Sequence, residues 1–294
     1  MLTFTFVMPQ PVRRAAVAGT WYSDLPDILA RDIDRYCARV DRRVSGDVAA
    51  VIAPHAGLMY SGPVAAYAYQ QLVGRSYEVA VVVGPSHYVG FEGVAVFPEG
   101  AFETPFGTLM VSEGDAAAIL AATPVVRDCR AAHRREHSLE MQLPFLQRVI
   151  PGTPIVPLIM GHQTRETVLG LAAGLATALQ SRRALLVASS DLSHYHDARQ
   201  AAKLDRVVVD AIEQFDPEAL DRALGKYPDH ACGGGPIIAV MRAARALGAA
   251  DSRVLAYADS GDVSGDKSAV VGYVAAVLGT FSGNCLPGRS EATR

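Results

Sequence analysis

The chain has 294 residues and a mass of 31.2 kDa, which is enough for one large domain or two small ones. Half of its residues are hydrophobic and 19% are charged, a composition that is typical of globular proteins and excludes a disordered or membrane-embedded chain. The formal net charge of -3, without a long run of Lys and Arg, argues against nucleic acid as a partner.

The N-terminal segment does not have the pattern of a signal peptide. Its short apolar stretch precedes the first arginines, and the long apolar region of a signal peptide is missing. Met8 is an alternative to Met1 as the start of the protein. No apolar run elsewhere is long enough to span a membrane. No CxxC pair indicates a zinc ribbon or a disulfide framework, so we expect a cytoplasmic protein with reduced cysteines: Cys37, Cys129, Cys232 and Cys285.

The predicted elements alternate between strands and helices along most of the chain. In order they are a strand at 47–53, a helix at 63–72, a strand at 78–84, helices at 114–122 and 138–150, a strand at 154–160, a helix at 165–179 and a strand at 184–190. Helices at 198–215, 217–224 and 235–247 follow, and then strands at 253–259 and 268–278. This order predicts a single α/β domain over 1–283, with a mostly parallel central sheet flanked by helices and a disordered tail at 284–294.

Polar clusters directly follow three of the predicted strands. His55 follows the first strand in PHAG, His87 follows the second in PSH, and Asp191 and His194 follow the fourth in DLSH. In open α/β sheets the ligand crevice lies at the carboxyl ends of the parallel strands. His55 and His87 are about one βαβ unit of roughly 30 residues apart, so we expect them at equivalent places on two strands. His55 alone is equally explained by a helix cap or a backbone hydrogen bond, but the three clusters together predict a site.

Two histidines at strand ends need one or two further donors to hold a divalent metal. Cys232 in HACGGGP is one candidate, because it precedes a predicted helix whose dipole and free amides favour a thiolate. Taken alone, a free cysteine is more often a small buried apolar residue. A carboxylate from Asp191 or Glu140 is the alternative, as in iron sites with two histidines and one carboxylate.

Other polar and aromatic residues carry weaker signals. His133 and His137 have the i, i+4 spacing of a metal site, but two arginines lie between them. Glu140 also fits the plainer role of beginning a helix. Trp21 either lines a pocket or attaches the N-terminal arm to the core, and we favour the arm. The remaining histidines are expected on the surface or in loops: His162, His196 and His230.

Motifs in a fixed order span nearly the whole chain. They are AGTWYS, APHAGLMYSGPVAAYAY, GPSHYVGFEGVAV, TPFGTL, EHSLEMQLPFL, SSDLSHY, CGGGP and GDKSAVVGY. In these motifs the chain resembles the Memo family, whose prokaryotic members are called AmmeMemoRadiSam system protein B. Several polar-rich motifs in order are far more specific than a single short pattern.

The resemblance implies a fold like that of the class III extradiol dioxygenases, which use non-haem Fe(II). It implies that His55, His87 and Cys232 are the metal ligands, with Fe(II) as the expected metal and copper or zinc as alternatives. Asp191 and His194 would line the same pocket, together with two residues of EHSLEMQLP: His137 and Glu140. Because a thiolate would replace the dioxygenase carboxylate, the likeness in fold does not carry ring cleavage with it.

Three functions remain open at this point. The first is a dioxygenase-like, metal-dependent oxidoreductase acting on a small organic substrate, in which His194 moves protons and Asp191 orients it. The second is a zinc-type hydrolase. The third is a non-catalytic protein that binds a peptide or a metal ion in the same cleft. The family name suggests a radical-SAM or AMMECR-type partner, whereas the residues do not indicate the substrate or the oligomeric state.

Overall fold

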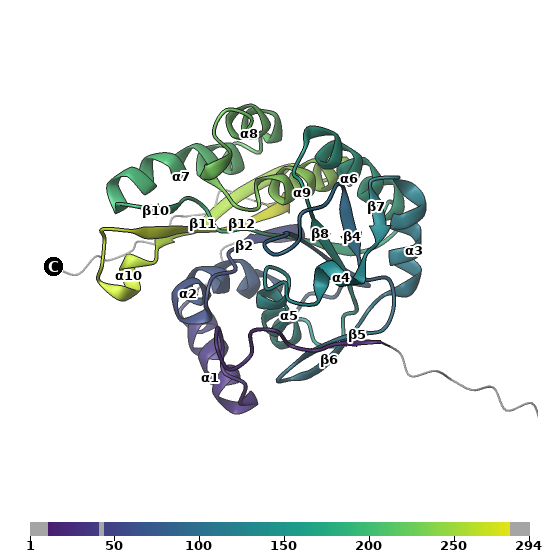
Figure 1. The fold of residues 1–294 in the computed structure, drawn as a ribbon, viewed down its shortest axis with the longest axis horizontal. Helices are drawn as coiled ribbons and strands as arrows, with labels where there is room; N and C mark the ends of the chain where they lie inside the picture. Colours follow the sequence, from purple (N-terminus) through teal and green to yellow (C-terminus); the bar gives the residue numbers. More distant parts are fainter. Residues whose placement is uncertain (1–10, 41–43, 283–294) are drawn as a thin grey trace, which may run out of the picture.

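The computed structural model describes residues 11–40 and 44–282 (Figure 1). The strands are β1 Val12–Arg13, β2 Gly46–Ala53, β3 Val79–Pro85, β4 Val94–Val96, β5 Ala101–Thr104, β6 Gly107–Met110, β7 Val126–Asp128, β8 Ile155–Met160, β9 Ala184–Ser189, β10 His194–His196, β11 Asp251–Asp259 and β12 Val270–Phe281. The helices are α1 Pro26–Cys37, α2 Leu58–Tyr69, α3 Glu113–Ala122, α4 Arg130–His133, α5 Leu143–Val149, α6 Arg165–Ala178, α7 Ala198–Glu213, α8 Pro217–Leu224, α9 Gly234–Ala246 and α10 Gly261–Ser264. Three short 3-10 helices complete this set: η1 Gln70–Leu72, η2 Glu140–Gln142 and η3 Pro228–His230.

Within the described residues, a nine-stranded mixed sheet has the order β10-β12-β2-β9-β3-β8-β4-β7, with β11 paired to β12. Its four central strands, β2, β9, β3 and β8, are parallel, and they are the strands that the apolar runs predict. Along β2, Val51 and Ala53 belong to one core whereas Ala50 and Ile52 belong to the other, because successive side chains of a strand point to opposite faces. Burial on both faces explains why these runs show no alternation.

Antiparallel pairs adjoin the parallel centre of the sheet on both sides, and the edge strand β7 then pairs parallel with β4. β12 pairs antiparallel with β2, β10 and β11, and β4 pairs antiparallel with β8. The short segment 260–269 joins β11 to β12, and so close a connection makes them an antiparallel pair. The predicted single α/β domain with a central sheet flanked by helices is confirmed, but the sheet is mixed rather than mostly parallel, because the pairs that adjoin its parallel centre are antiparallel, as the short connection requires for β11 and β12.

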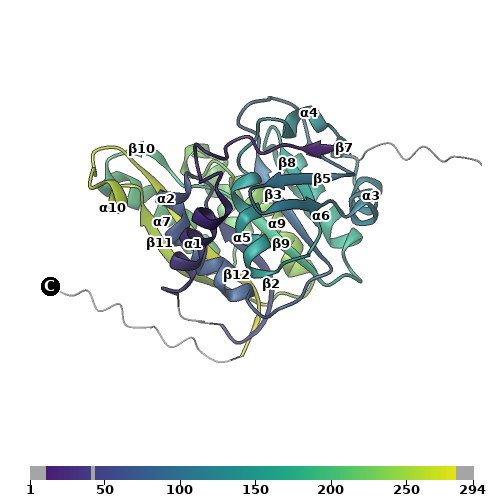
Figure 2. The same cartoon turned by 90° about the horizontal axis from the view of Figure 1, so that it is seen from below.

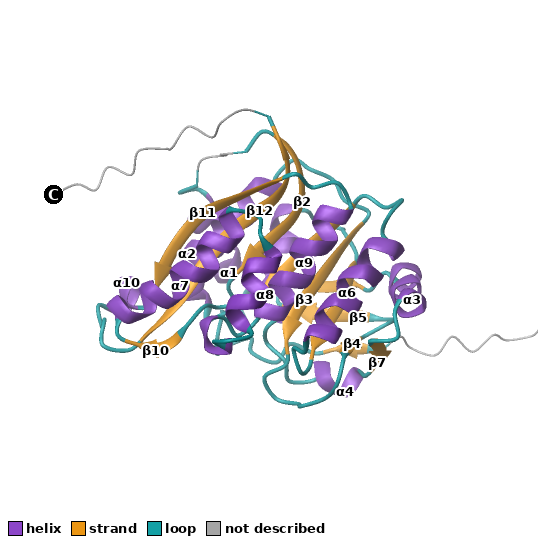
Figure 3. Cartoon of the chain, turned by 90° about the horizontal axis from the view of Figure 1, so that it is seen from above, coloured by secondary structure: helices purple, strands orange, loops and turns teal. Residues whose placement is uncertain are grey.

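Helices cover both faces of the large sheet. α1, α2 and α5 lie on one face, together with the small sheet β1-β5-β6 (Figure 2). α3, α6, α7, α8 and α9 lie on the other face (Figure 3). None of the helices in the described part of the chain is both long and apolar enough to cross a membrane.

Several element boundaries differ from the prediction. α1 was not predicted, although its buried Leu29, Ile33 and Tyr36 follow helical spacing. α2 begins at Leu58 and contains Pro63, which was expected to begin the helix. The helix predicted at 138–150 is divided into η2 and α5, with Pro144 in the first turn of α5, where a missing N–H costs little. The predicted tail at 284–294 lies outside the described residues.

Candidate metal centre

The carboxyl ends of β2, β3 and β9 lie side by side and carry the candidate residues. The register pairs Ala53 with Ser189 and Val83 with Ala188, so the three strands end at nearly the same level. His55, His87 and Asp191 each come two residues after the end of their strand. The structure therefore brings these segments to one edge of the sheet.

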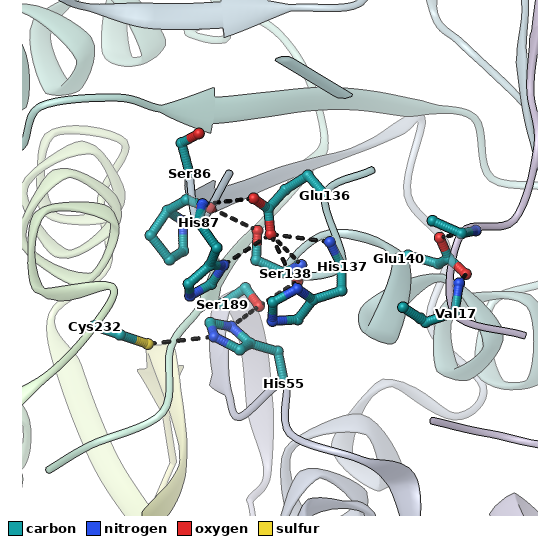
Figure 4. A network of polar contacts seen from close by, with 12 residues as sticks. Val17, His55, Ser86, His87, Glu136, His137, Ser138, Glu140, Ser189 and Cys232 are labelled. Atoms are coloured by element: carbon teal, nitrogen blue, oxygen red, sulfur yellow. Dashed lines mark hydrogen bonds and ion pairs between the residues drawn. The ribbon is translucent and has the colours of Figure 1, made fainter. Parts of the chain in front are cut away.

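His55, His87 and Cys232 form a compact group of donors. One ligand atom from each lies within 4.8 Å of the other two. His55 Nε2 is 3.2 Å from Cys232 Sγ (Figure 4). Metal–nitrogen and metal–sulfur bonds of about 2.0–2.3 Å separate tetrahedral ligands by roughly 3–4 Å. The three donors therefore fit one divalent metal ion after small shifts.

The hydrogen bonds of Ser189 determine which nitrogen of His55 is free. The Ser189 hydroxyl donates its one proton to the Ser138 carbonyl at 2.6 Å, so it accepts from His55 Nδ1 at 2.9 Å. Burial lowers the pKa of His55 well below its usual value, with the nearby His87 as the next cause, so the ring is neutral. Nδ1 then carries the proton, and the lone pair of Nε2 faces the Cys232 thiol.

The Glu136 carboxylate fixes the ring of His87 in the same way. Its Oε1 is 2.8 Å from His87 Nδ1, and its Oε2 accepts from the His87 backbone N–H at 2.7 Å. This leaves His87 Nε2 for a metal, in the carboxylate–histidine–metal arrangement that raises the basicity of a ligand. Two rings with the same nitrogen left free support a metal site over simple packing.

Glu136 belongs to a second group of potential ligands, with His87 and His137. Oε1 also accepts the backbone N–H groups of His137 and Ser138, each at 2.9 Å. Burial opposes ionisation of Glu136, but the hydrogen bonds from His87 and Ser138 prevail and lower its pKa to about 2. Because these donors already occupy the carboxylate, Glu136 orients His87 rather than competing for a metal.

His137 lies against the cluster. Its ring centroid is 4.2 Å from that of Trp21 and 4.4 Å from that of His87. Burial, with the nearby His55 and His87, lowers the pKa of His137 to about 3, so the ring is neutral. The side chain is buried, and its Nδ1 makes no hydrogen bond within the described residues.

Asp191 holds the loop that carries His55. Its Oδ1 accepts the backbone N–H groups of His55 at 2.7 Å and Ala56 at 3.3 Å. Burial raises the pKa of Asp191 to about 6, against these hydrogen bonds. The structure does not support the expectation that Asp191 orients His194, because His194 Nδ1 instead donates to the Leu192 carbonyl at 2.8 Å.

Cys232 directly precedes the amino end of α9. The Gln163 amide donates to its carbonyl at 2.7 Å, and its own N–H donates to the Asp191 carbonyl at 3.2 Å. We expected the helix dipole to lower the pKa of this thiol. The structure gives the opposite direction, since burial and then the Asp191 carboxyl raise it well above its usual value.

The structure separates Glu140 from the metal donors. Its fully buried carboxylate pairs with Arg13 and accepts the backbone N–H of Ala16 at 2.8 Å and of Val17 at 3.0 Å. The Tyr22 hydroxyl donates to the same carboxylate at 2.6 Å. With its acceptors already occupied by the N-terminal arm, Glu140 is not placed to bind a metal or a substrate. Of the two alternative carboxylate ligands considered from the sequence, neither replaces Cys232 in the donor group.

A cavity of about 990 Å³ lies beside the donor group and has His87 and Cys232 in its wall. His194 and His196 of β10 also line it, although His196 was expected on the surface. Tyr195, between them, has a φ of 64° and lies at an irregularity in the β10–β12 pairing. Such a bulge redirects side chains and is common beside active sites. His162 lines the same cavity and is exposed, as expected, whereas His230, also expected on the surface or in a loop, is buried.

Glu136 is the main site residue that the sequence prediction missed. It stands next to His137 in the motif that supplied both His137 and Glu140 as candidates. An acid adjacent to a candidate histidine was the available signal. Which of the two acids faces His87 depends on where η2 begins, and the apolar pattern does not show that point.

Comparisons with known proteins agree with one another. A family model described as Memo-like protein matches residues 13–277. A MEMO1 family protein of Methanothermobacter thermautotrophicus is 38% identical over 277 residues, covering 89% of this chain and 98% of that protein. One from Aeropyrum pernix is 37% identical, covering 90% and 98%. A solved structure of an uncharacterised Escherichia coli K12 protein has a TM-score of 0.51 at 15% identity, covering 80% of this chain and all of that one, which shows likeness in fold.

Proposed function

The chain belongs to the Memo-like protein family, and from this premise we propose that it is a mononuclear non-haem iron protein with dioxygenase-like oxidoreductase activity. His55, His87 and Cys232 would hold Fe(II), and the adjacent cavity would bind a small organic substrate. One observation carries the proposal. Both imidazoles have Nδ1 engaged in a hydrogen bond, which leaves their Nε2 atoms free in a group whose ligand atoms lie within 4.8 Å of one another, at the wall of a cavity.

Fe(II) at this position would supply open coordination sites for O2 and substrate. The protein supplies proton transfer and orientation. His194 lines the cavity, and its Nδ1–H donates to the Leu192 carbonyl, so a neutral ring has its lone pair on Nε2. This nitrogen would accept a proton from the substrate. Asp191 keeps the His55 loop in place, and the neutral ring of His137 borders the donor group.

The thiol donor favours a second candidate, a protein that binds a metal or a peptide without turnover. Soft sulfur ligands select Cu(I) and zinc as readily as iron. With zinc, the same three donors and an open fourth position would suit a hydrolase. Either alternative would act together with a radical-SAM or AMMECR-type partner protein. Anaerobic co-purification of the two proteins tests this partnership.

The first experiment is anaerobic purification followed by mass spectrometry of bound iron, copper and zinc. It compares the wild type with His55→Ala and Cys232→Ala. His162→Ala is the matched control, because His162 lines the cavity outside the donor group. We expect about one iron per wild-type chain, loss in both donor variants and retention in the control. A wild type without stoichiometric metal would contradict the proposal.

Oxygen dependence separates the candidate functions. An oxidoreductase consumes O2 when it turns over a substrate, and this consumption disappears in Cys232→Ala. Turnover that persists under strict anaerobiosis with zinc bound would favour the hydrolase. Stoichiometric ligand binding without any product would favour the binding protein.

A further inference from the structure

Arg13 connects the N-terminal arm, residues 12–22, to one short segment beside the metal donors. Its buried guanidinium donates to the His133 carbonyl at 3.0 Å and also to the Glu136 carbonyl. It pairs with the Glu140 carboxylate as well. All three acceptors belong to the segment 133–140, which carries Glu136 and His137. One planar side chain thus fixes both ends and the middle of this segment.

Glu140 gathers the other contacts of the arm. Besides Arg13, its carboxylate accepts two consecutive backbone N–H groups, from Ala16 and Val17, and the Tyr22 hydroxyl. A buried carboxylate is costly unless it is paired and fully hydrogen-bonded, and here it is both. The carboxylate therefore fixes the path of the arm from residue 13 to residue 22.

Trp21 contacts two segments that carry site residues: the start of α2, after His55, and the segment that carries His137. Its carbonyl accepts the Leu58 N–H at 2.8 Å, which places it at the start of α2, three residues after His55. Its ring lies 4.2 Å from that of His137, and His137 in turn lies against His87. The arm thus touches the segment before α2 and the segment that orients His87.

We propose that the N-terminal arm is a positioning element of the metal centre. Arg13 and Glu140 hold the segment 133–140 so that the Glu136 carboxylate stays at His87 Nδ1. Trp21 keeps the ring of His137 against that of His87. This inference rests on the proposed metal site and adds to it residues that touch neither metal nor cavity. Arg13 and Glu140 are therefore positioning residues.

Arg13→Lys is the principal variant, because a lysine ammonium keeps the charge but cannot reach three acceptors in one plane. Arg14→Lys is its matched control: Arg14 is adjacent in sequence, exposed, and paired with Glu103 on the surface. The acidic partners of these two arginines give a second pair of variants: Glu140→Gln tests the partner of Arg13, and Glu103→Gln, the partner of Arg14, is its control. Circular dichroism and urea unfolding establish that each variant is folded.

Co(II) is the probe, and it is titrated anaerobically into metal-free protein. The thiolate-to-cobalt absorption gives the affinity for Co(II), and the ligand-field bands give the coordination geometry. If Arg13 and Glu140 only stabilised the fold, the coordination geometry would not change in their variants. Trp21, the single tryptophan of the sequence, reports the position of the arm by its fluorescence. We expect Arg13→Lys and Glu140→Gln to bind Co(II) about 10–100-fold more weakly with altered bands. Both controls should match the wild type.

A folded Arg13→Lys with a red-shifted Trp21 emission but wild-type affinity and bands would overturn the proposal. If Arg13→Lys does not fold, Glu140→Gln decides by the same criteria. A wild type that binds no Co(II) refutes the proposed function, and the arm is then judged in the metal-free protein by proton NMR. There, the Nδ1–H of His87 should exchange faster with solvent in Arg13→Lys than in Arg14→Lys, and equal exchange rates would refute the positioning role.

Discussion

His133 makes the stability of the protein depend on pH. Its side chain is 1% exposed and packs beside the rings of Phe97 and Phe102. Nε2 donates to the Ala95 carbonyl at 3.1 Å, whereas Nδ1 makes no hydrogen bond within the described residues. Burial is the main cause that lowers its pKa from 6.5 to about 3 in the folded protein, and the Arg13 cation adds to it.

The direction of the effect follows from the proton balance. The unfolded chain binds a proton at this side chain below pH 6.5, and the folded chain does not until the pH approaches about 3. The contribution of His133 to the free energy of unfolding is therefore fully present above pH 6.5. It is lost as the pH falls from 6.5 towards about 3. At about 1.4 kcal/mol per pH unit, the loss at a pH near 5 is about 2 kcal/mol.

The assay is urea unfolding of wild type and His133→Gln at a pH near 7.5 and near 5, with a chelator present throughout. Glutamine keeps an N–H donor for the Ala95 carbonyl but does not titrate. The difference in unfolding free energy between the two proteins should shrink by about 2 kcal/mol on acidification, since other titrating groups cancel. An unchanged difference would refute the assignment of a neutral, buried His133.

Three further predictions concern the site and the sheet beneath it. Glu136→Gln should weaken metal binding about 10–100-fold in a chelator competition, and equal affinity would contradict the role of Glu136 at His87. Because Gln lacks the charge that the surrounding N–H groups stabilise, urea unfolding of the metal-free variant should also show a loss of about 1–3 kcal/mol. Adding metal at about 100 times its dissociation constant should raise the unfolding free energy by about 2.7 kcal/mol, an effect that must vanish in Cys232→Ser. Gly272→Ala should lower the unfolding free energy by about 1–3 kcal/mol, because its Cβ would lie 2.0 Å from the buried Asp205 carboxylate; wild-type stability in urea would show that this contact relaxes freely.

The central strands could be predicted from sequence because burial on both faces leaves a clear signal. β2, β3, β8 and β9 are uninterrupted apolar runs. β4, β5, β6 and β7 have only three or four residues each, too few to show a period, and they were not predicted. Their strand structure depends on neighbours that pair with them, and a local pattern does not contain that information.

The donor group was predictable to different degrees. The positions of His55 and His87 followed from strand ends, whereas Cys232 was selected over a carboxylate only through the family resemblance. Glu140 was predicted as a site residue and Glu136 was not, whereas the structure places Glu136 in the site and Glu140 outside it. They are four residues apart in one segment: Glu136 lies before η2 and faces His87, whereas Glu140 is the first residue of η2 and faces the N-terminal arm.

The candidate metal donors are widely separated along the chain: His55 and Cys232 are 177 residues apart. During synthesis, the donor group cannot be completed until the ribosome has passed α8 and the thiol-bearing turn has emerged. An unfolded chain does not hold such distant donors together, so the donor group can form only when β2 and β3 are in place and the turn at Cys232 has packed beside them. Metal acquisition would therefore report that the chain has folded as far as the turn before α9, and the rate of metal release to a strong chelator should approach the rate at which this turn separates from the strand ends.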